Sequence, residues 1–151
     1  MRGTTNAQTG VAKAKPFTLQ WDGVWERSST DSYWYDIHYF DAQASAILDE
    51  VQSIVAEGRL ISSRLTNHIS DGSTAYGEKQ YAQLITGLSS SGGIVVSLRD
   101  RYTNANLQGP LTFTRQSSGI WKYTNVRTSS RTSTAGDRTT GYIQGIIFYI
   151  A

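Results

Sequence analysis

Apolar and polar residues alternate from residue 16 onward with the period of a β-strand. Phe17, Leu19 and Trp21 alternate with threonine, glutamine and aspartate, and side chains two residues apart share one face of a strand. An Asp-Gly pair follows at positions 22 and 23, and this dipeptide is typical of type I′ hairpin turns. The pattern predicts a hairpin here, preceded by a flexible lead over residues 1 to 15, which are small and polar without periodicity.

The segment DSYWYDIHYFD at residues 31 to 41 is predicted to be a second strand with two unlike faces. One face is wholly aromatic or aliphatic and comprises Tyr33, Tyr35, Ile37 and Tyr39. The other face is mixed and comprises Trp34, Asp36, His38 and Phe40. Because apolar faces pack inward, we predict that the tyrosine face packs. The mixed face is then predicted to lie outside or at an interface, where it could contact a ligand or partner.

Residues 42 to 70 change to the period of an amphipathic helix. Their apolar stripe consists of Ala46, Ile47, Val51, Ile54, Val55, Ile61, Leu65 and Ile69. Asp41 or Ser45 can cap the start of this helix. Gly58 interrupts the stripe, and two arrangements follow: one long helix containing this glycine, at a cost of about 1 kcal/mol relative to alanine, or a helix that ends there before another begins.

The same stripe permits two kinds of packing. An approximate heptad runs through Ile47, Val51, Ile54, Ile61, Leu65 and His68, as in a short coiled coil, and isoleucine-rich seams favour trimers or higher states. Alternatively, the stripe packs against the chain's own β-sheet, as amphipathic helices usually do. The second arrangement is favoured because fewer than four clean heptads are present and a glycine occupies one seam position.

The remainder of the chain is predicted to be mainly β. Residues 74 to 88 could form another short helix, with Tyr81, Leu84, Ile85 and Leu88 facing inward. Strands are expected in 94–102, 111–116, 119–128 and 141–151, with a long exposed loop over 128–141. The last segment, GYIQGIIFYIA, is apolar on both faces and should be a central or interface strand. The fold class is therefore α+β and β-dominated, an antiparallel sheet or sandwich with one or two amphipathic helices between residues 42 and 88, in one domain spanning 16–151.

Composition narrows the class of protein. Charged residues make up 17% of the 151 residues, below the roughly 25% typical of soluble domains, and such weakly charged surfaces are common in β-rich extracellular and virion proteins. There is no cysteine, so disulfides and thiolate chemistry are excluded. We find no signal-peptide pattern and no apolar run long enough to span a bilayer, so synthesis in the cytoplasm without membrane insertion is expected.

The net charge of +2 conceals an asymmetry along the chain. Residues 1 to 57 contain four basic and eight acidic side chains, whereas residues 99 to 151 contain seven basic and two acidic ones. The two regions are expected to face and complement each other. Nucleic-acid binding is not expected, because the basic residues are dispersed and form no run.

Signatures of catalysis are sparse. The chain has no nucleophile elbow, zinc-protease motif, P-loop or dinucleotide fingerprint. Two histidines without cysteine cannot form an ordinary zinc site within one chain, and no metal or cofactor is expected. His38 with Asp36 or Glu26 could act as an acid and base pair in hydrolysis. Because such residues coincide on strands by chance, an enzyme is not expected.

Binding is the remaining class of function. Tryptophan and tyrosine rings stack on sugars and dominate protein interfaces, while nearby polar side chains bond hydroxyl groups. The candidate contact residues are the mixed face of the second strand and a basic, aromatic stretch near the C-terminus: Trp34, Asp36, His38, Trp121, Tyr123, Arg127 and Arg131.

The layout of the chain resembles that of bacteriophage tail-fibre and receptor-binding proteins. A polar lead precedes the partial heptads of ILDEVQSIVAEGRLISSRL, and a Gly/Ser/Thr-rich β tract ends in GYIQGIIFYIA. The aromatic β region before the helix departs from a simple shaft-then-tip plan. The resemblance implies a non-enzymatic structural or host-attachment component of a virion, made in the host cytoplasm. It also implies a homo-oligomer, with a trimer favoured, that contacts other virion proteins or a host-surface glycan. The alternatives are a monomeric carbohydrate-binding module and a small hydrolase centred on His38 and Asp36.

Overall fold

The chain was analysed as a computed structural model, which describes residues 10–27, 33–70, 78–98, 110–127, 135–136 and 138–151. These residues form eight strands and one helix. In chain order they are β1 (Ala12–Arg27), β2 (Trp34–Phe40), α2 (Ala42–Ala56), β3 (Leu60–Ser70), β4 (Glu78–Leu88), β5 (Ile94–Leu98), β6 (Leu111–Arg115), β7 (Trp121–Arg127) and β8 (Arg138–Ile150).

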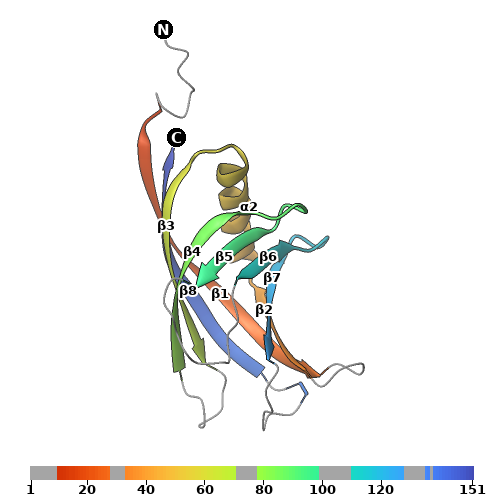
Figure 1. Ribbon diagram of the computed structural model, residues 1–151. Coiled ribbons are helices and arrows are strands. Elements are labelled where there is room, and N and C mark those ends of the chain that lie inside the picture. The colour runs from red at the N-terminus through yellow and green to blue at the C-terminus, as the bar shows by residue number, and fades with distance from the viewer. Residues whose placement is uncertain (1–9, 28–32, 71–77, 99–109, 128–134, 137) are drawn as a thin grey trace.

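The strands form one closed antiparallel barrel in the order β1-β2-β7-β6-β5-β4-β3-β8 (Figure 1). The last strand closes it by pairing with β1 on one side and β3 on the other. The predicted β-dominated fold is confirmed, and the sheet is a barrel and not a sandwich. The apolar segment GYIQGIIFYIA is confirmed as a strand with neighbours on both sides, β1 and β3. Its Ile143 and Ile147 are buried in the core.

The helix α2 lies at the end of the barrel at which β1 begins and β8 ends (Figure 1). Asp41 caps it, since its Oδ1 accepts a 2.7 Å hydrogen bond from Ala44 N, and Gly58 follows its end in the left-handed region, with φ of 72°. Leu48, Val51 and Ile54 are buried against the barrel. The predicted packing of the helix on the chain's own sheet is confirmed, but its buried stripe includes Leu48, which was not predicted, and leaves Ala46 exposed. Within the described residues there is no helix long and apolar enough to cross a bilayer.

The predictions of a coiled coil and of a second helix after Gly58 are wrong. Residues 60–70 and 78–88 form strands β3 and β4, so the chain after Gly58 is extended. Residues four apart lie on one face of a helix and also on one face of a strand. The spacing of Ile61 and Leu65 therefore does not distinguish the two structures. A bulge between Leu60 and Ser62 then changes the register, which leaves Ile61 54% exposed while Leu65 is buried.

The hairpin predicted at residues 22 and 23 is also wrong, because β1 continues through both positions. A glycine is needed at position 23 because neighbouring side chains leave no room for a Cβ, and not because the chain turns there. A Cβ at this position would overlap Thr139 Oγ1 and lie 2.9 Å from His38 Cδ2. In addition β1 begins at Ala12, so residues 12 to 15 of the predicted lead belong to the barrel. Residues 1 to 9 and most of the predicted 128–141 loop lie outside the described residues, with β8 already beginning at Arg138.

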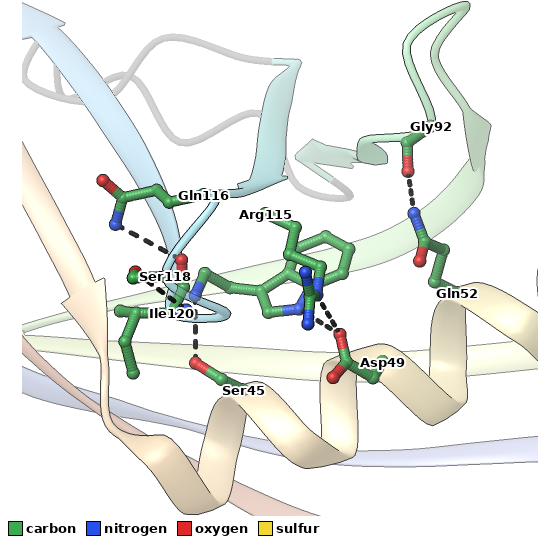
Figure 2. A network of polar contacts seen from close by, with 9 residues as sticks. Ser45, Asp49, Gln52, Gly92, Arg115, Gln116, Ser118 and Ile120 are labelled. Carbon is green, nitrogen blue, oxygen red and sulfur yellow. Dashed lines mark hydrogen bonds and ion pairs between the residues drawn. The ribbon is translucent and has the colours of Figure 1, made fainter.

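A polar stripe on α2 attaches the helix to the end of β6, the start of β7 and the turn between β4 and β5 (Figure 2). Ser45 Oγ accepts from Trp121 N at 2.9 Å. Asp49 Oδ1 accepts from Trp121 Nε1 and from Arg115 Nε, each at 2.8 Å. Gln52 Nε2 donates to the carbonyl oxygen of Gly92 at 2.6 Å. The Asp49–Arg115 pair is one contact of the kind predicted between the acidic and basic regions of the chain.

Candidate functional site

The two faces of β2 are oriented opposite to the prediction. Trp34, Asp36, His38 and Phe40 point into the barrel and are buried, whereas Tyr33, Tyr35, Ile37 and Tyr39 face outward with partial exposure. The expectation that the mixed face lies outside or at an interface is therefore wrong. The physical reason is that the polar side chains on this face find partners inside the barrel, which removes the penalty of burying them.

Asp36 and His38 form the centre of a buried polar cluster. His38 Nε2 lies 2.6 Å from Asp36 Oδ2, and the two side chains are 0% and 3% exposed. Thr139 Oγ1 donates to Asp36 Oδ1 at 3.1 Å from β8. The His38 ring stacks on Trp21 with centroids 3.7 Å apart and planes 3° from parallel. Three strands therefore fix the positions of this pair.

The cluster extends across the barrel through Asn67 on β3. Trp21 Nε1 donates to Asn67 Oδ1 at 3.2 Å, and Asn67 Nδ2 donates to Tyr123 Oη at 2.7 Å. The Tyr123 ring in turn meets the His38 ring edge-on, with centroids 4.4 Å apart. Among the described residues, His38 Nδ1 and both amide atoms of the buried Gln83 make no hydrogen bond. The cluster links five strands, and it is enclosed by the barrel.

The remaining predicted site residues are dispersed. Trp34 is buried, edge-on to Trp25, with the Arg27 guanidinium carbon 5.5 Å from its ring centroid. Trp121, at the start of β7 beside α2, is 0% exposed, so the prediction that it contacts a partner is wrong. Arg127 ends β7, but its side chain is outside the described part of the structure, as is Arg131 entirely. The structure thus brings together three of the predicted residues, Asp36, His38 and Tyr123, and all three are buried.

An accessible depression lies on the outer surface of β1, β8 and β3. Its volume is about 490 Å³, within the range of ligand pockets. Its lining is mostly polar and aromatic, and comprises Gln20, Trp21, Asp22, Asp41, His68, Thr140, Gly141 and Tyr142. We call this depression the outer pocket. None of its residues was predicted as a contact residue from the sequence.

Strand register brings the lining of the outer pocket together. Tyr142 on β8 pairs with Gln20 of β1 on one side and with His68 of β3 on the other. Asp22 pairs with Thr140 in the next outward-facing row. Asp41, just before α2, is held beside the Gln20–Tyr142 row because its backbone N–H donates to Gln20 O at 3.1 Å. Four segments far apart in the sequence therefore contribute to one surface.

The aromatic wall of the outer pocket is formed by two rings. Tyr142 and His68 have centroids 4.5 Å apart and planes 15° from parallel. This separation is close to the roughly 4.8 Å between neighbouring strands, so the rings stand side by side on their strands. With His68 against one face of Tyr142, the other face of that ring is directed toward β1 and the pocket.

The outer pocket is rich in hydrogen-bond acceptors. Within the described residues, the side chain of Asp22 takes part in no ion pair or hydrogen bond. Asp41 uses Oδ1 to cap α2, which fixes the orientation of its second oxygen. Gln20 and Thr140 add polar atoms at the exposed rim. In the part of the chain that the structure describes, no three histidine, cysteine or acidic side chains are grouped closely enough to hold a metal ion.

Comparisons with known proteins identify no relative: no family model matches the chain, and no curated protein or solved structure is significantly similar to it.

Proposed function

We propose that the protein is a non-enzymatic binding protein that holds a saccharide in the outer pocket. The observation that supports this proposal most directly is the position of Tyr142, whose ring stacks on His68 and lines a depression that Asp22, Asp41 and Gln20 also line. Sugars present apolar ring faces that stack on aromatic side chains, together with hydroxyl groups that donate to carboxylate and amide oxygens. The pocket offers both kinds of contact at an accessible site.

The hydrolase alternative is less consistent with the geometry. His38 and Asp36 do lie together, as an acid and base pair requires, but their exposures of 0% and 2% leave no surface for a substrate. The predicted alternative partner, Glu26, pairs with outward-facing Tyr35 on β2. Asp22 and Asp41 of the outer pocket are both exposed, whereas a glycosidase needs one carboxyl group in apolar surroundings to serve as its acid.

The resemblance to bacteriophage attachment proteins supplies a biological setting for this proposal. In that setting the ligand of the outer pocket is a glycan on the host surface, and the chain is part of a virion. The same pocket would serve a monomeric carbohydrate-binding module equally well. Oligomeric state distinguishes these two settings, and glycan binding tests the function that they share.

Replacing Tyr142 should weaken saccharide binding. We expect Tyr142→Ala to lower the affinity about three- to tenfold, because an aromatic contact contributes roughly 0.5–1.5 kcal/mol beyond the area that it buries. Tyr142→Phe keeps the ring and should bind within about twofold of the parent chain. Binding is measured by screening immobilised glycans and then titrating the best one in solution. Gln144→Ala, at the next outward position of β8, is the matched control and should have no effect. Equal binding by Tyr142→Ala would contradict the proposal.

A second candidate function, assembly with further copies of the same chain, is favoured by an apolar patch elsewhere on the barrel. Ile61 and Phe148 are 54% and 41% exposed. Both line a groove of about 460 Å³ that is formed by β3, β4 and β8. Large apolar side chains gathered in this way often mark protein interfaces. The predicted homo-oligomer would use this patch.

Absolute mass by light scattering tests the assembly. If the parent chain is oligomeric, we expect Phe148→Ser to shift it to monomer without unfolding it, because this ring contributes to the surface and not to the core. Phe113→Ser alters a fully buried ring and should unfold the chain, which separates the two kinds of loss. A parent chain that is monomeric at every concentration would exclude this use of the patch.

A further inference from the structure

The outer pocket has an unbalanced charge. Two carboxylates, Asp22 and Asp41, line it, and no lysine or arginine does. Asp22 has no ion-pair partner among the described residues. Asp41 is partly compensated by the N-terminus of α2, which it caps. Asp22 therefore presents a carboxylate that forms no ion pair with any described side chain.

The neighbouring basic side chains leave this charge in place. In the barrel, Asp22 pairs with Tyr39, which pairs in turn with Lys122, so the lysine lies two strands away, about 10 Å by strand spacing. Arg138 is diagonal to Asp22 across β1 and β8, about 7–8 Å away by register. Neither side chain forms an ion pair with Asp22 among the described residues. Lys122 lies beyond the Debye length of about 8 Å at physiological ionic strength, so its effect on Asp22 is largely screened, whereas Arg138 lies at about that length and offsets the charge of Asp22 only in part.

The aromatic wall favours the same sign of ligand charge. A cation placed over the face of a tyrosine is attracted by the negative potential of the ring. The pocket-facing side of Tyr142 borders the space that Asp22 and Asp41 also line. Two carboxylates and a ring face around one space form a site whose electrostatics favour an ammonium group over a neutral group of the same size.

We infer that the saccharide bound in the outer pocket carries a free amino group, as in glycans that contain glucosamine units. This inference rests on the proposed function and specifies its substrate class. The ammonium group lies between the Asp22 carboxylate and the face of Tyr142, and hydroxyl groups of the same sugar donate to Asp41 and Gln20. An N-acetylated sugar loses the charge and adds bulk at this position.

The test compares two β-1,4-linked oligosaccharides of equal length, one of glucosamine and one of N-acetylglucosamine, with a glucose oligomer as a third ligand. Titration calorimetry with the full chain should give an affinity for the glucosamine oligomer that is about fivefold or more above that for the other two, since exposed ion pairs and cation–π contacts each contribute modestly. The preference should shrink as salt is raised.

Three variants locate the origin of the preference. Asp22→Asn should remove most of the preference, and it should weaken binding of the glucosamine oligomer more than binding of the neutral oligomers, because asparagine keeps one acceptor oxygen at this position. Asp41→Asn should reduce the preference in part, and asparagine still caps α2. Glu26→Gln removes an exposed charge from the same strand without touching the pocket, so it is the matched control and should leave the preference unchanged.

The outcomes of these titrations distinguish a failure of the inference from a failure of the proposed function. Equal binding of charged and neutral oligomers by the parent chain would overturn the inference and leave the proposed function standing. A preference that is undiminished in Asp22→Asn, or that is lost equally in Glu26→Gln, would also overturn it, because the attraction would then come from the general surface charge. Binding of none of the three oligomers, nor of any glycan in the wider screen, would overturn the proposed function together with the inference.

Discussion

Ile54→Asp should unfold the barrel, whereas Ile61→Asp should leave it folded. Ile54 lies on α2 with 1% of its surface exposed, and Ile61 lies at the start of β3 with 54% exposed. Loss of a buried isoleucine costs about 2–5 kcal/mol, and an unpaired carboxylate in its place adds several kcal/mol more. The sum is comparable to the roughly 5–15 kcal/mol that stabilises a domain.

Circular dichroism and urea unfolding measure this difference directly. Ile54→Val, which removes one methyl group, should lower the free energy of unfolding by only about 0.5–1.5 kcal/mol and shows that position 54 tolerates conservative change. In a coiled coil both aspartate variants would dissociate into soluble chains. If the two variants unfold at the same urea concentration as the parent chain, α2 cannot be part of the core.

His38→Leu should be the most destabilising change in the polar interior, at about 3–5 kcal/mol. Removal of one member of a buried pair leaves the other without compensation. Here the remaining Asp36 would keep only the hydrogen bond from Thr139. The stacking of the imidazole on Trp21 would be lost as well.

A double-mutant cycle separates the pair from the packing around it. His38→Leu combined with Asp36→Leu should cost clearly less than the sum of the two single changes, because neither polar group is then left unpaired. Thr139→Val deletes only one donor and should cost about 1 kcal/mol. Strictly additive losses in urea unfolding would show that the 2.6 Å contact between His38 and Asp36 contributes no coupling.

Periodicity located most of the strands, but it could not decide which face of a strand is buried. For β2 the wholly apolar face was expected inside, yet Asp36 and His38 are inside because they contact each other and Asp36 accepts from Thr139. Thr139 lies more than a hundred residues along the chain, on β8. The choice between the faces therefore depends on a partner that local pattern does not reveal.

The helix boundary was partly predictable for a definite physical reason. Asp41, one of two predicted caps, begins the helix, and Gly58 follows its end, which is one of the two arrangements predicted for this glycine. Beyond Gly58 the isoleucines and leucines recur every four residues, which satisfies the periods of a helix and of a strand alike. The bulge after Leu60 and the pairing of β3 with β8 decide the outcome.

The outer pocket could not be predicted from the sequence because it depends on register. Gln20, His68 and Tyr142 become neighbours only when β8 pairs with β1 and β3 in one alignment. A shift of one residue along β8 would turn Tyr142 inward and disperse the site. From the sequence alone, His68 is expected only in a possible helical seam.

Closure of the barrel by β8 also governs the order in which the molecule can be assembled. Ala12 pairs with Ile150, so the first described strand gains its second neighbour only when the last one arrives. Contacts between residues so far apart in sequence carry a large loop-closure entropy, and folds dominated by them fold slowly. During synthesis at the ribosome, β1 and β3 must each wait with one edge unpaired until the final strand emerges. This interval is when the chain is most open to pairing with the wrong strand or with another chain.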